Sequence, residues 1–122
     1  MVRKWEIYFI GLDPISGSEQ GGKRPVLVIS NDAVNKNLPI FTCIPFSSLK
    51  ENEKVYPTEV FLKKEESGLN KDSVLMIHQI RTVSIKRIIN SKINEIKNPI
   101  IRKRINDAIK EYFEFDDSMF SC

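Results

Sequence analysis

The chain has 122 residues, of which 41% are hydrophobic and 29% charged, and its formal net charge at pH 7 is +3. This length suits one domain with its own core, so we expect a single domain spanning residues 1–122. The composition excludes a disordered chain, no apolar run approaches the ~20 residues of a membrane span, and the N-terminus lacks the apolar stretch of a secretion signal. We therefore expect a soluble, cytoplasmic protein with no membrane association.

The first predicted strand, residues 7–10, leads into a glycine-rich loop, which is the most informative part of the sequence. Three glycines within residues 17–22 let the backbone approach a ligand closely, and Pro25 restricts Arg24 to extended geometry. An arginine placed where a loop meets a buried strand is suited to grip an anion, and a phosphate fits its fork of donors best. The alternative is a solvated hairpin with an incidental arginine.

The remaining predicted strands are short, apolar and separated by polar connections. They cover residues 25–30, 41–46, 59–62 and 73–83. We expect Pro25 at the entry of its strand, where the missing N–H is tolerated. Many short strands at close spacing favour a small barrel.

The end of the chain changes to a helical pattern. Asn98 is a suitable N-cap, and Pro99 suits the first turn of a helix. Apolar residues then recur at helical spacing: Ile101, Ile105, Ala108, Ile109 and Tyr112. We expect a closing helix whose apolar face packs on the barrel.

Charge is unevenly distributed toward the C-terminus. Residues 81–110 hold nine Lys or Arg and two acidic residues, and nine minus two gives a local charge of +7. An acidic tail follows, made of Glu111, Glu114, Asp116 and Asp117. The basic segment is a candidate face for a polyanion, although a run of charge is more often a solvated face.

The sequence offers no pattern for a metal site or a disulfide. Cys43 lies in a strand pattern and Cys122 at the terminus, without metal-ligand spacing, and His78 is the only histidine. We expect no metal, no disulfide and no cofactor.

Several short motifs occur together in one order along the chain. They are Asp13-Pro14, Gly17-Ser18-Glu19-Gln20, Arg24 to Asp32, Pro45-Phe46-Ser47-Ser48, Asp72-Ser73 and Gln79-Ile80-Arg81. In order and spacing this set resembles the MazF/PemK family of bacterial toxins, which are ribonucleases of type II toxin–antitoxin systems. The resemblance runs from Tyr8 to Arg87. It implies a mainly β fold with α elements: an SH3-like small β-barrel with appended helices, including a C-terminal one (CcdB/MazF-like), in a symmetric homodimer.

The resemblance also assigns site residues. Arg24 matches the family's main catalytic residue, and Ser47 takes the place of a hydroxyl residue that is often Thr. The expected RNA contacts are Ser18, Glu19, Gln20, Ser48, Asp72, Ser73, His78 and Gln79. The alternative for Glu19 and Gln20 is that they are solvated loop residues without a binding role. For Asp72 the alternative is a turn residue, and for Gln79 it is a residue on the surface of a strand.

Two positions depart from the family pattern. His78 stands where relatives commonly have an acid, which puts the recognised RNA sequence in doubt. A lone histidine on a strand is more often structural than catalytic. Trp5 stands near the first strand where Gly is usual, and we expect it to pack on the barrel or on a dimer partner.

The resemblance implies a toxin that cleaves single-stranded mRNA at a short sequence, without metal, leaving a 2′,3′-cyclic phosphate and a 5′-hydroxyl. A cognate antitoxin protein is the expected partner. One alternative is a noncatalytic SH3-like barrel that binds nucleic acid or protein. Another is the gyrase-poisoning branch of the same barrel, which lacks the Arg24-Pro25 context and its loop.

Overall fold

The computed structural model describes residues 1–50 and 52–115, so the predicted Asp116, Asp117 and Cys122 lie outside the described residues. The strands are β1 (Glu6–Gly11), β2 (Lys23–Val28), β3 (Ile40–Ser48), β4 (Glu59–Leu62), β5 (Ser73–Met76), β6 (Arg81–Ser84) and β7 (Asn94–Glu95). The helices are α1 (Asp32–Asn37), α2 (Lys64–Ser67) and α3 (Pro99–Phe113), with 3₁₀ turns η1 (Ile77–Gln79) and η2 (Ile85–Arg87).

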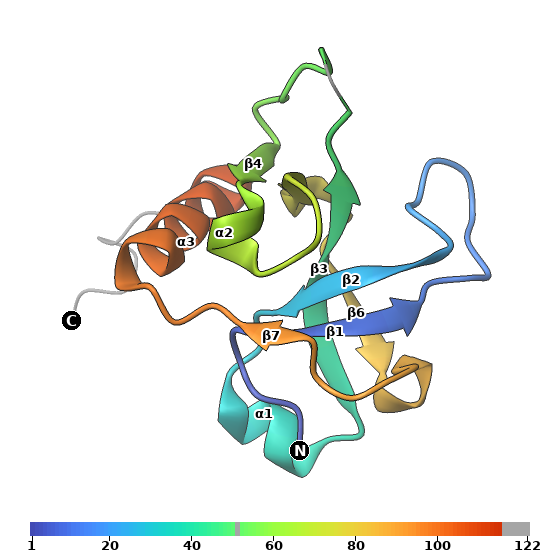
Figure 1. The fold of residues 1–122 in the computed structure, drawn as a ribbon. Coiled ribbons are helices and arrows are strands. Elements are labelled where there is room, and N and C mark those ends of the chain that lie inside the picture. The colour runs from blue at the N-terminus through green and yellow to red at the C-terminus, as the bar shows by residue number, and fades with distance from the viewer. Residues whose placement is uncertain (51, 116–122) are drawn as a thin grey trace.

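The strands form one antiparallel sheet in the order β4-β5-β3-β2-β1-β7, with β6 also paired to β3. Strand β3 is the axis of this sheet. One of its edges pairs with β2, while the other is divided between β6, along Ile40 to Cys43, and β5, along Phe46 to Ser48. Because β5 and β6 leave the same edge in different directions, the sheet curls into a half-barrel (Figure 1). The mainly β fold with appended helices is thereby confirmed.

Two predicted strands require correction. Residues 73–83 form β5 and β6 rather than one strand, because η1 interrupts them where Ile80 N donates to Ile77 O at 3.2 Å. The nearly continuous apolar run from Val74 to Ile77 hides this turn. The second strand begins at Lys23 rather than Pro25, so the proline lies inside β2 and not at its entry.

The C-terminal helix starts where the sequence predicted. Asn98 caps it by accepting a hydrogen bond from Ile100 N at 2.8 Å, and Pro99 is the first helical residue. Ile101 and Ile105 are buried, and the helix packs against β4 and η1. Tyr112 is 43% exposed, so its place on the buried face was wrongly predicted. No helix within the described part of the chain combines the length and apolar character that a membrane crossing requires.

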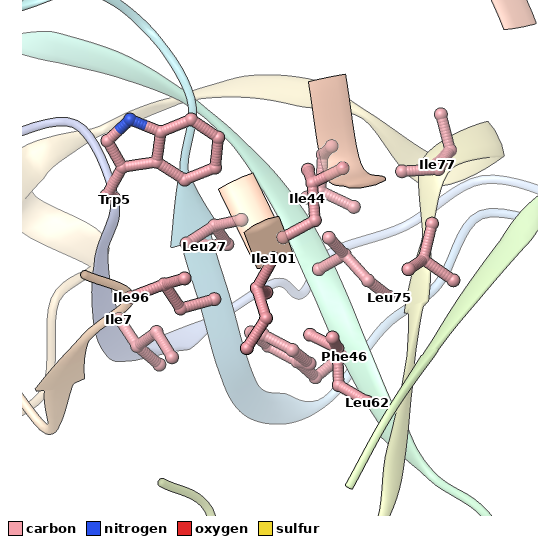
Figure 2. Packing of buried hydrophobic residues seen from close by; sticks show 12 residues of the cluster. Trp5, Ile7, Leu27, Ile44, Phe46, Leu62, Leu75, Ile77, Ile96 and Ile101 are labelled. Carbon is pink, nitrogen blue, oxygen red and sulfur yellow. The ribbon is translucent and has the colours of Figure 1, made fainter. Parts of the chain in front are cut away.

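The sheet is apolar on both faces. One face packs on α3 through a large cluster that includes Ile7, Leu27, Ile44 and Phe46 (Figure 2). Trp5 is 8% exposed and lies in this cluster, which confirms that it packs on the barrel. Strand residues that face the other way join Val2 and Leu12, which flank β1, in a second cluster: Val2, Tyr8, Ile10, Leu12, Val26, Val28, Phe41, Cys43 and Val83.

Candidate functional site

Arg24 lies in β2 at the end of the glycine-rich loop, half-buried and paired with Ile10 of β1. Its Nε donates to Gly21 O at 3.0 Å and its Nη1 donates to Phe46 O at 3.0 Å. These bonds engage two of the five N–H donors of a guanidinium. Burial lowers the pKa of Arg24 from its ordinary value because desolvation disfavours the charged form. The side chain is thus fixed at two atoms, and its remaining donors have no partner within the described residues.

Pro25 explains why Arg24 reaches the carbonyl of Phe46. The ladder between β2 and β3 runs from Val28↔Cys43 to Val26↔Pro45, so the next pair would be residues 25 and 46. Ile29 N donates to Thr42 O, and by alternation the N–H of residue 25 would donate to Phe46 O. Proline has no N–H, so the ladder stops and Arg24 supplies the donor instead. The two strands separate at this point.

The adjacent serines of β3 have different positions relative to Arg24. A register continued for two residues beyond Val26↔Pro45 would set Ser47 opposite Arg24, but the ladder stops before that pair. Ser48 points to the face opposite to that of Ser47 and pairs with Ser73 of β5. The two predicted catalytic residues therefore lie on neighbouring strands, 23 positions apart in the sequence, and both lie beyond the last paired residues, Val26 and Pro45.

A pocket of about 470 Å³ opens where β2 and β3 separate. Three predicted residues contribute to its wall: Arg24, Ser48 and Ser73. The other lining residues were not predicted as site residues from the sequence, and they are Phe9, Lys23, Pro25, Phe46, Gly68, Leu69, Asn70, Lys71 and Ile93. Among residues 1–50 and 52–115, no carboxylate lines the pocket, and Lys23 and Lys71 are exposed at it. It combines an apolar surface with cations, as a nucleotide-binding pocket does.

The loop between β1 and β2 is fastened to the sheet at its tip. Gln20 N donates to Gln79 Oε1 at 2.9 Å, and Gln79 Nε2 donates to Ser18 O at 3.3 Å. Glu19 closes a turn inside the loop, because its carboxylate accepts from Ser16 N at 2.7 Å. Four of the predicted RNA contacts are therefore gathered around one loop, and His78 is exposed beside Gln79.

Asp72 and Ser73 have structural partners. The Asp72 carboxylate accepts from Lys64 N at 2.9 Å and so caps the start of α2. Ser73 is 3% exposed, and its hydroxyl donates to Lys71 O at 3.0 Å. These contacts favour the turn alternative for Asp72, and an RNA contact at either residue remains a prediction.

The basic segment is not one continuous cationic face. Four of its nine cations form ion pairs with carboxylates: Lys92, Arg102, Lys103 and Arg104. Two others, Arg81 and Arg87, donate to backbone carbonyls of the loop after β1. Much of the local +7 is therefore neutralised or used within the fold, which favours the solvated-face alternative.

The described residues contain no group of three or more His, Cys, Asp or Glu side chains placed to hold a metal ion. Cys43 is a free, buried thiol, and desolvation raises its pKa to about 12 despite the nearby positive charge of Arg81. A thiol held in its neutral form is a poor nucleophile and metal ligand. Arg24 and its surroundings are therefore the main candidate for chemistry.

Comparisons with known proteins agree with the observed fold. A family model described as PemK-like, MazF-like toxin of type II toxin-antitoxin system matches residues 3–113. MazF from Deinococcus radiodurans has a similar structure, with a TM-score of 0.77 at 21% identity over 93% of this chain and 97% of that chain. An endoribonuclease in complex with its cognate antitoxin, from a mycobacterial species, gives 0.75 at 18% identity over 95% and 98%. The Mycobacterium tuberculosis toxin MazF-mt6 gives 0.71 at 22% identity over 91% and 98%.

Proposed function

The chain belongs to the family of PemK-like, MazF-like toxins of type II toxin–antitoxin systems, and from this premise we propose that it is a sequence-specific endoribonuclease. The proposed reaction cleaves single-stranded mRNA without a metal ion and leaves a 2′,3′-cyclic phosphate and a 5′-hydroxyl. The observation that supports it most directly is the placement of Arg24, which is fixed at two atoms, has donors left for a phosphate and lines the pocket.

In this reaction the neighbouring 2′-hydroxyl loses its proton to water and attacks phosphorus, a phosphorane with extra negative charge forms, and the bond from phosphorus to the 5′ oxygen breaks as that oxygen takes up a proton. The free donors of Arg24 suit the stabilisation of the phosphorane, because a guanidinium bonds two phosphate oxygens at once. Burial lowers the pKa of Arg24, but a guanidinium stays charged, so its proposed role is to stabilise negative charge on the phosphate. Ser47 would hydrogen-bond the same phosphate from the adjacent strand.

RNA recognition is proposed for the loop and for the pocket beside it. Ser18, Glu19, Gln20, His78 and Gln79 have amide, carboxylate, hydroxyl and imidazole groups that read the edges of unpaired bases. Ser48, Asp72 and Ser73 would contact the RNA on the pocket side. Lys23 and Lys71 are suited to the flanking phosphates.

We propose a cytoplasmic homodimer of this single domain, restrained by an acidic antitoxin segment that covers the RNA site and displaces the loop at residues 17–23. One similar solved structure is described as an endoribonuclease in complex with its cognate antitoxin, which supports this partner. Sedimentation at several protein concentrations tests the assembly, and a monomer at every concentration would contradict it.

The decisive experiment is incubation of the purified protein with a long, protein-free RNA in excess EDTA, followed by mapping of both cut ends. We expect cleavage at a short sequence with 2′,3′-cyclic phosphate and 5′-hydroxyl ends. Binding without cleavage would support the noncatalytic barrel instead. Activity that disappears in EDTA and returns with Mg²⁺, or products with a 5′-phosphate, would contradict the proposed chemistry.

A further inference from the structure

Arg87 is an arginine to which the proposed function gives no role, and it bonds the loop at its base. It lies in η2, half-buried, and its Nη1 donates to Asp13 O at 2.6 Å and to Gly11 O at 3.2 Å. These carbonyls belong to residues 74 and 76 positions away, where β1 ends and the loop begins. Hydrogen bonds from a charged donor are stronger than those between neutral groups. This contact therefore fixes the loop where it leaves β1.

The backbone beneath Arg87 is itself fixed to β1. Ile88 forms a β-bridge with Ile10, and Ile89 N donates to Phe9 O at 2.9 Å. Ile88 also packs against the second apolar cluster. The backbone next to Arg87 is therefore fixed beside β1, and the guanidinium contacts the end of that strand.

Further hydrogen bonds join the two ends of the β1–β2 loop. Leu12 N donates to Gly22 O at 2.9 Å, and the carboxylate of Asp13 accepts from Gly22 N at 3.1 Å. Gly21 O is the acceptor for Arg24 Nε. An unbroken series of contacts thus leads from Arg87 through Asp13 and the glycine pair to the guanidinium of Arg24.

We propose that Arg87 is a positioning residue: it holds the base of the β1–β2 loop so that Arg24 keeps the orientation needed for catalysis. The catalytic part of this inference rests on the proposed ribonuclease function. Gln79 holds the tip of the same loop, so Arg87 and Gln79 together would set its position over the site. The competing explanation is that Arg87 binds an RNA phosphate directly with its unused donors.

The test compares Arg87→Ala, Arg87→Lys and a matched control, Lys86→Ala. Lys86 is exposed, carries the same charge and adjoins Arg87, but its side chain makes no contact with the loop among the described residues. Two quantities are measured: amide hydrogen exchange at Leu12 and Gly22 by NMR, and the split of cleavage kinetics into kcat and KM at several salt concentrations. The first does not depend on RNA cleavage.

For Arg87→Ala we expect exchange at Leu12 and Gly22 to accelerate about tenfold or more, as loss of a charge-assisted bond implies. Exchange at Leu27 in the middle of β2 should be unchanged. The kcat should fall about tenfold with little change in KM, since an interaction that orients a catalytic group acts on the chemical step. Arg87→Lys should be intermediate and Lys86→Ala should resemble wild type. If Arg87→Ala fails to fold, Arg87→Lys is used for the same two measurements.

Unchanged exchange at both amides would overturn the inference, and so would accelerated exchange with normal kcat. A rise in KM would assign Arg87 to RNA binding instead if the slope of binding against salt concentration also fell by the amount expected for about one phosphate contact. If the wild-type protein cleaves no RNA, the proposed function fails, whereas the exchange data still decide whether Arg87 holds the loop.

Discussion

The apolar cluster under α3 and the loop region around Arg24 are stabilised in different ways. In the cluster, side chains such as Leu27, Ile44 and Ile105 are fully buried and contact many neighbours, so the free energy is distributed over a large area. Around Arg24, single hydrogen bonds join side chains to backbone carbonyls, among them two that lie 22 and 74 positions away in the sequence. A change in the cluster should therefore lower the stability of the whole fold, and a change in the loop region should alter the chemistry while the fold persists.

The strongest test of this difference is Arg24→Ala. We expect kcat to fall about 10³-fold, since the main group that stabilises the phosphorane is removed. The free energy of unfolding should fall by no more than about 2 kcal/mol, because two hydrogen bonds at a partly exposed site are lost. Arg24→Lys should not restore cleavage, because a point charge cannot grip two oxygens. Near-normal turnover by either purified variant would remove Arg24 from the mechanism.

The opposite result is expected for Ile105→Ala in the buried face of α3. Truncating this fully buried side chain should lower the free energy of unfolding by about 2–5 kcal/mol while the folded fraction keeps its cleavage activity. Ile100→Ala is the matched control on the same helix, because Ile100 is 72% exposed, and its effect should stay within about 0.5 kcal/mol. Chemical denaturation of both variants measures this, and equal effects at the two positions would contradict the packing of α3.

A smaller effect should separate the two adjacent serines of β3. Ser47→Ala removes the hydroxyl proposed to hydrogen-bond the reacting phosphate, and we expect a loss of about 10- to 100-fold in kcat with unchanged stability. Ser48→Ala should matter less, because Ser48 is proposed to contact the RNA and not the reacting phosphate. Single-turnover cleavage of one RNA by both variants makes the comparison. A larger loss for Ser48→Ala would move the second catalytic hydroxyl to the pocket.

The smallest expected effect is a change in preference rather than in rate. His78 is exposed beside Gln79, so His78→Glu should alter the cleaved sequence by about tenfold at one base while Arg24-dependent cleavage persists. Sequencing the cut ends of a transcript pool shows the change. Superimposable cut-site profiles for wild type and variant would exclude a reading role for His78.

The sequence by itself determined the features that depend on near neighbours in the chain. Asn98 and Pro99 start α3 because a cap and a fixed φ act within one turn. Short apolar runs predicted most strands, and the two faces of the curled sheet that they form are both apolar. The Arg24-Pro25 pair predicted an arginine aimed at an anion, and its side chain does end a strand ladder beside a cationic pocket.

Only the tertiary structure decided how distant segments meet. The division of residues 73–83 at η1 follows from β3 sharing one edge between β5 and β6, which no local pattern records. The contacts of Arg87 with Asp13 O, of Gln79 with Gln20 N and of Arg24 with Phe46 O join residues 22 to 74 positions apart. In each of these bonds one partner is a backbone group, which every residue possesses, so the sequence does not indicate which backbone group will be used. The register of the folded sheet selects them.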